Sequence, residues 1–134
     1  MKLESLEFSI GEVKRASPTQ PEAINTNIDI LAAEVDKNFL FMDFTYLATY
    51  VPDGSYVRLA GKARFSGPES AKVVEEWKKT RKLSGEAGEN ILNAINFAAS
   101  SNSVFLTRVM SMAPPLMLSK LKITPPAEAQ GKKK

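Results

Sequence analysis

The sequence predicts an α+β domain in which a four-stranded antiparallel sheet is followed by two helices. Two observations lead to this fold class. Apolar and polar residues alternate through the first half of the chain, and turn-forming residues separate the alternating segments. After residue 66 the apolar spacing changes to three and four, which is the period of an amphipathic helix.

The first two strands are predicted from short runs of alternation. Leu6, Phe8 and Ile10 alternate with polar residues, which indicates a strand with one buried face. The alternation breaks at Gly11, where we expect a β-bulge. A second strand begins near Ile28, and its apolar phase shifts after Ile30.

The third strand, residues 39–51, has the longest apolar pattern. One face is continuously apolar and is predicted to lie in the core, and it consists of Leu40, Met42, Phe44, Tyr46, Ala48 and Tyr50. The other face mixes Asp43 and threonines with the apolar residues Phe39, Phe41, Leu47 and Val51. The turn sequence 52–54 (Pro-Asp-Gly) predicts a hairpin, so the fourth strand, residues 57–65, should pair antiparallel with the third.

Two helices are predicted to follow the sheet. Ser66 can cap the first helix, which should end near Lys82 and has a narrow apolar stripe of Val73, Val74 and Trp77. The second helix should begin around Glu86 and end before the two prolines at 114–115. Its predicted buried stripe is Ile91, Ile95, Ala98, Asn102, Phe105, Val109 and Met112.

Composition limits the possible chemistry. At 134 residues we expect a single domain over residues 1–123 and a disordered basic tail over 124–134. The chain has no His and no Cys, and the remaining residues form no recognisable base, nucleophile or ligand set. We therefore expect no enzyme activity, no cofactor and no metal site.

Charge and hydropathy limit the possible partners. Apart from the three lysines at 132–134, acidic and basic residues are equal in number, which argues against an extensive nucleic-acid-binding surface. No apolar run approaches the roughly 20 residues of a membrane helix, and the N-terminus is too polar for a signal peptide. We expect a cytoplasmic protein with no membrane span.

The order of elements resembles that of the SecB protein-export chaperone and its relatives. The residues that carry the likeness are Val35–Phe39 with the third strand, and the last helix followed by residues 115–118, Pro-Leu-Met-Leu. The resemblance spans about residues 3–123. It implies four subunits, for example as a dimer of dimers, with helices sandwiched between sheets. It also implies that unfolded polypeptides bind in hydrophobic grooves without nucleotide hydrolysis.

The sequence departs from this family in its charge. Bacterial members are acidic and use acidic residues of the sheet to dock the SecA motor. Here the body of the chain is neutral, and the fourth strand carries Arg58, Lys62 and Arg64. The resemblance therefore gives no basis for expecting SecA docking, and a different client role is open.

The candidate site residues fall into three groups. Phe39, Phe41, Leu47 and Val51 could line a client groove, or helices, the tail or a neighbouring subunit could cover them. Met110, Met112, Leu116 and Met117 form a flexible apolar cluster suited to varied clients, and the alternative is core filling at a helix end. Val73, Val74 and Trp77 could contact another subunit or pack within their own.

These observations lead to one hypothesis and two rivals. The hypothesis is a homo-oligomeric, ATP-independent chaperone that binds non-native polypeptides in hydrophobic grooves. The first rival is a small adaptor or structural protein that binds one folded partner. The second is a weak nucleic-acid binder that uses the basic residues at the end of the first helix, Lys78, Lys79, Arg81 and Lys82.

Overall fold

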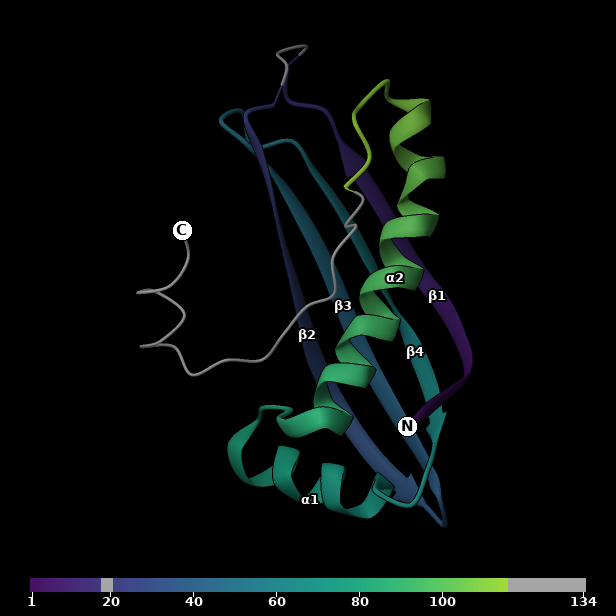
Figure 1. The fold of residues 1–134 in the computed structure, drawn as a ribbon. Helices are drawn as coiled ribbons and strands as arrows, with labels where there is room; N and C mark the ends of the chain where they lie inside the picture. The colour runs from purple at the N-terminus through teal and green to yellow at the C-terminus, as the bar shows by residue number, and fades with distance from the viewer. Residues whose placement is uncertain (18–20, 116–134) are drawn as a thin grey trace.

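A computed structural model of the chain describes residues 1–17 and 21–115. The predicted fold class is confirmed, because four strands precede two helices (Figure 1). The elements are β1 (Lys2–Lys14), β2 (Ala23–Asp36), β3 (Phe39–Val51), β4 (Tyr56–Ser66), α1 (Ser70–Thr80) and α2 (Gly85–Val109). The expected tail at residues 124–134 lies outside the described residues. No described helix is long and apolar enough to cross a bilayer.

The sheet is antiparallel throughout, in the order β1-β4-β3-β2. The predicted hairpin of β3 and β4 is present, with Thr49 opposite Tyr56 beside the turn. Both helices lie on one face of the sheet (Figure 1), where α2 packs against β1 and β4 and α1 packs against β2 and β3. We call the helix-covered face the inner face and the opposite one the outer face.

Bulges in the two edge strands change which side chains face inward. In β1 the register shifts between Phe8 and Ile10, so the bulge lies before Gly11 and not at it, as the alternation predicted. Ile10 is consequently 42% exposed on the outer face, whereas Gly11 lies inward beside Leu106. In β2 the register shifts between Ile30 and Ala32, which accounts for the predicted change of phase.

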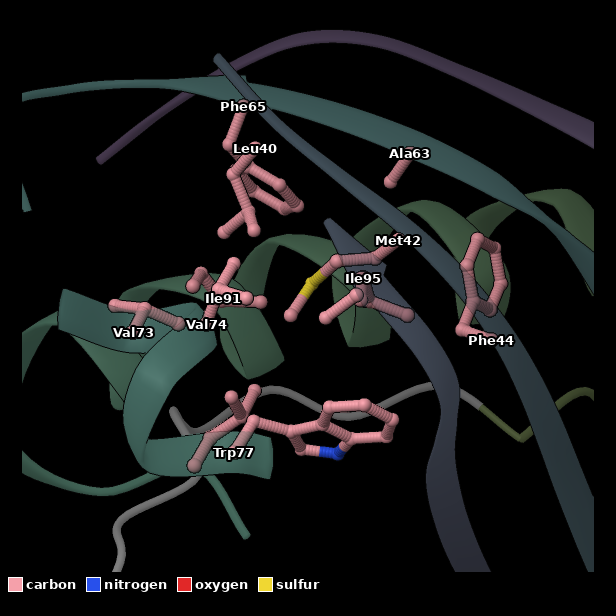
Figure 2. Close-up of a cluster of buried hydrophobic side chains, with 12 residues drawn as sticks. Leu40, Met42, Phe44, Ala63, Phe65, Val73, Val74, Trp77, Ile91 and Ile95 are labelled. Carbon is pink, nitrogen blue, oxygen red and sulfur yellow. The ribbon is translucent and has the colours of Figure 1, made fainter. Parts of the chain in front are cut away.

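The inner side chains of β3 form the centre of the core, as predicted. Leu40, Phe44, Tyr46 and Ala48 are fully buried. Around the first part of β3, Figure 2 shows Trp77 of α1 and Ile91 and Ile95 of α2 gathered against Met42. A second cluster surrounds Tyr46 and Tyr50 and includes Ala99 of α2.

The first helix begins later than the sequence predicted. Ser66 remains the last residue of β4, where its hydroxyl donates to Glu4, so it cannot cap α1. Ser70 ties the start of α1 to the sheet instead, because its hydroxyl donates to the carbonyl of Asn38 at 2.9 Å. The helix ends at Thr80, and Arg81 follows with a φ of 62°.

The predicted buried stripe of α2 is right in its first half and wrong in its second. Ile91 and Ile95 are fully buried, but Asn102 is exposed, and Phe105 and Val109 are 68% and 79% exposed. A polar row takes the buried positions instead, and it consists of Asn96, Ser100, Ser103 and Thr107. The three hydroxyl groups can be buried because each donates to a carbonyl of its own helix.

Candidate polypeptide-binding surface

Three of the four predicted client-binding residues of β3 are exposed on the outer face. Phe39, Phe41 and Leu47 are 38%, 42% and 37% exposed, and Val51 at the end of the strand is partly buried. Because both helices pack on the inner face, neither covers these side chains (Figure 1). We call Phe39, Phe41 and Leu47 the outer apolar row.

The outer face is hollowed around Phe41. The hollow has a volume of about 450 Å³ and crosses all four strands. It is lined by Ser5, Glu7, Ala32, Ala33, Glu34, Phe41, Met42, Asp43, Lys62, Ala63 and Arg64. An apolar ring at the edge of a concave surface can receive a side chain of an extended peptide.

Charges on the outer face alternate in sign from strand to strand. Glu7 of β1 lies opposite Lys62 of β4, which in turn lies opposite Asp43 of β3. Further along the sheet, Arg58 contacts Glu12 at 3.3 Å. The guanidinium of Arg64 lies 5.3 Å from the centre of the Phe39 ring. The basic residues predicted on β4 are thus interleaved with acidic ones of the neighbouring strands.

One member of the predicted methionine group, Met112, lies on the inner face. Met110 and Met112 follow α2, and Met112 packs against the cluster around Tyr46 and Tyr50 on the inner face. Leu116 and Met117 lie outside the described residues. The structure therefore places Met112 on the face opposite the outer apolar row, so the two groups of candidate residues that the sequence predicted do not meet there.

The apolar stripe of α1 is buried within its own subunit. Val73, Val74 and Trp77 are only 7%, 3% and 4% exposed and contact the first part of β3 (Figure 2). The indole of Trp77 is also covered by Arg81, whose guanidinium carbon lies 4.5 Å from the ring centre. Of the two alternatives for this stripe, the structure shows packing within the subunit, so these side chains are not available on the surface for a second copy.

Sequence reasoning missed an exposed apolar surface on α2. Phe97 is 72% exposed, and it lies eight residues before Phe105 and twelve before Val109. Each step of four residues turns by about 40° around an α-helix, so the three side chains share one broad, exposed side of α2. We call these three residues the α2 outer stripe. The spacing is visible in the sequence, but Phe105 and Val109 were placed in the buried stripe of the helix.

Two buried tyrosines hold the chain that follows α2. The hydroxyl of Tyr46 donates to the Pro115 carbonyl at 3.4 Å, and that of Tyr50 donates to the Ala113 carbonyl. Burial raises the pKa of Tyr46 to about 12, with a further contribution from Tyr50. Burial likewise raises the pKa of Tyr50 to about 12. Both phenols therefore remain hydrogen-bond donors throughout the physiological pH range.

In the turn between β3 and β4, the carboxylate of Asp53 accepts two hydrogen bonds. The backbone N–H of Ser55 donates to Asp53 at 2.9 Å, and the hydroxyl of Ser17 donates to the same carboxylate at 2.9 Å. These hydrogen bonds lower the pKa of Asp53. Asp53 thus ties the loop after β1 to the hairpin and has a structural role.

A solved structure has the same arrangement of strands and helices. It is the Mycobacterium tuberculosis Rv1957 SecB-like chaperone in complex with a ChAD peptide from the Rv1956 HigA1 antitoxin, with a TM-score of 0.58. The fold of this chain is SecB-like. The match covers 92% of each chain at 13% sequence identity, so the likeness is one of fold. Comparisons with protein-family models and with curated proteins found no match.

Proposed function

We propose that this chain is a chaperone-type protein that binds non-native polypeptides without nucleotide hydrolysis. The observation that carries the proposal is the outer apolar row beside the hollow at Phe41, on a face that neither helix covers. The SecB-like fold supports it, because the similar mycobacterial chaperone is in complex with a peptide.

The binding mechanism follows from the pattern of the outer face. An extended client places alternate side chains on the same side, so its apolar side chains can contact Phe39 and Phe41 two residues apart on β3. Burial of apolar surface supplies about 25 cal/mol per Å² before the cost of ordering the client. The alternating charges around the hollow can contact polar client side chains of either sign. Release then follows when the client folds and buries its own apolar residues.

We further propose that the chain forms a homo-oligomer through α2. The α2 outer stripe exposes three large apolar side chains, and such a surface is typical of an interface. The resemblance to SecB predicts helices between two sheets, and α2 lies on the face where a second copy would produce that arrangement (Figure 1). The proposed contact thus uses α2 rather than the predicted residues of α1, whose side chains are in the core.

Suppression of aggregation tests the proposed function. Purified chain is mixed at several ratios with a client diluted from denaturant, and light scattering is followed without nucleotide. We expect suppression that saturates near a fixed subunit ratio for several unrelated clients. No suppression with any client, or a stable complex with one folded protein only, would favour the adaptor and contradict the chaperone.

A further inference from the structure

The residues that follow α2 leave the helix through a strained turn. The Met112 amide donates to the Thr107 carbonyl at 2.9 Å, and the Ser111 amide donates to the Arg108 carbonyl at 3.2 Å. These two bonds form the Schellman ending of a helix, in which the turning residue is usually glycine. Here that residue is Ser111, whose φ of 55° is a left-handed conformation that is unfavourable for a residue with a Cβ. The turn that brings the next residues onto the sheet therefore carries strain.

Residues 112–115 lie on the inner face of the sheet, and we call them the strap. The Ala113 carbonyl accepts a hydrogen bond from the hydroxyl of Tyr50, and the Pro115 carbonyl accepts one from that of Tyr46. The strap therefore runs antiparallel to β3. In Figure 1 it is the yellow-green end of the described chain.

The sequence of the strap limits how it can bind the sheet. Pro114 and Pro115 have no backbone N–H, so these two residues can offer only carbonyl acceptors from their backbone. The residue before a proline favours an extended backbone, and both Ala113 and Pro114 precede one. Met112 is the apolar anchor of the strap, because its side chain packs against the cluster around the two tyrosines, whereas Ala113 is exposed. Two phenol hydroxyls and one thioether side chain thus hold an extended segment.

The two tyrosines bind the backbone of the strap and not its side chains. Carbonyl groups two residues apart in an extended chain point to the same side, so Tyr46 and Tyr50 can bind alternate carbonyls of any such chain. Apolar side chains lie next to both phenols, since Ile24 pairs with Tyr50 and Ile28 pairs with Tyr46. This part of the inner face therefore offers donors for a polypeptide backbone and apolar contacts for its side chains.

We propose that the strap occupies a second polypeptide-binding site on the inner face, and that an extended segment of a non-native client binds there in its place. The inference rests on the proposed function, because it requires a chain that binds such clients. A client segment can accept the same two phenol hydrogen bonds as the strap, so the exchange leaves their number unchanged. Displacement relieves the strain at Ser111 and costs the packing of Met112. The strap thereby lowers the apparent affinity of the inner site.

Methionine methyl NMR of the full chain tests the proposal. The probe is a fluorescein-labelled protein whose disulfides have been reduced and carboxymethylated, so that it stays unfolded without denaturant. Saturation with this client should move the Met112 methyl signal from its position beside the tyrosines to that of a solvent-exposed methionine. A saturated complex with an unmoved Met112 signal would overturn the inner site and leave binding at the outer face standing. Failure of the client to bind at all would overturn both this inference and the proposed function.

The affinities of two variants for the same client provide a second test. Met112→Ala removes the anchor of the strap, so the site is open in a larger fraction of molecules and binding should be at least about threefold tighter. Met110→Ala is the matched control, because Met110 lies before the turn and outside the cluster around the two tyrosines, and its affinity should equal that of the parent chain. Unchanged affinity in Met112→Ala, or an equal gain in both variants, would overturn the proposal. Weaker binding in Met112→Ala would make Met112 itself a client contact, which would also overturn it.

Discussion

The Cβ position of Gly61 on β4 lies 2.1 Å from the carbonyl oxygen of Glu7 on β1. The bulge between Phe8 and Ile10 brings the β1 backbone this close. Any larger residue at position 61 must displace backbone rather than a flexible side chain. The bulge in β1 and the glycine in β4 are therefore two parts of one feature, and this feature turns Ile10 outward.

The first prediction follows from this contact. Gly61→Ala should lower the free energy of unfolding by about 3 kcal/mol, measured by urea denaturation with the single Trp77 as the fluorescent probe. Gly11→Ala is the matched control, because its Cβ would meet Leu59 and Leu106 at 3.5 Å, an ordinary contact distance. Equal stabilities of the two variants would show that the β1 backbone moves without cost.

The second prediction separates core packing from subunit contact in α1. Trp77→Ala should cost about 3–5 kcal/mol of unfolding free energy at concentrations where the chain is monomeric, because the indole is buried in the core. Phe105→Ala, which truncates an exposed ring, should change that value by less than about 0.5 kcal/mol. If Trp77→Ala dissociated an oligomer and left the monomer equally stable, the burial of this side chain within its own subunit would be wrong.

The third prediction concerns the proposed interface on α2. Phe105→Asp places a charge in the middle of the α2 outer stripe, so sedimentation should show a loss of mass relative to the parent chain. Asn102→Asp adds the same charge at an exposed polar position of the same helix and should leave the mass unchanged. If both variants sedimented as the parent chain does, the interface would have to lie on another surface.

The fourth prediction concerns alkaline pH. The pKa values of Tyr46 and Tyr50 are raised from 10.0 to about 12, so the folded chain retains protons that the unfolded chain loses. Their contribution to stability is complete below pH 10 and is lost as the pH rises toward 12. The urea midpoint should therefore fall across this interval, and it should fall less steeply in Tyr50→Phe. Identical slopes for the two proteins would contradict the burial of the Tyr50 phenol.

The sequence predicted the strands better than the faces of the second helix. The alternation on β3 identified every second residue from Leu40 to Tyr50 as core. A strand that helices cover on one face only has a hydrophobic period of two residues. On α2 the same reasoning failed, since Ser103 and Thr107 are buried after bonding to their own helix, and Phe105 is exposed. Hydrophobicity alone cannot show which side-chain hydroxyl groups will donate to backbone carbonyls and can therefore be buried.

The candidate site, like α2, could be predicted from the sequence only in part. The mixed face of β3 was visible in the sequence, so Phe39, Phe41 and Leu47 could be named. The hollow beside them could not, because it is formed by four strands whose registers depend on the bulges. Met112 was assigned to a separate methionine cluster on residue type alone, and only the fold shows that it lies on the opposite face from these residues.

The most direct test of the account compares two positions on the outer face. Phe41 and Ile10 are both 42% exposed, but only Phe41 lines the hollow. Phe41→Ser and Ile10→Ser are each titrated with a fluorescent unfolded client, after circular dichroism has confirmed that they are folded. The account predicts affinity about tenfold weaker for Phe41→Ser and a change of less than about twofold for Ile10→Ser. Equal affinities for the two variants and the parent chain would contradict client binding at this surface.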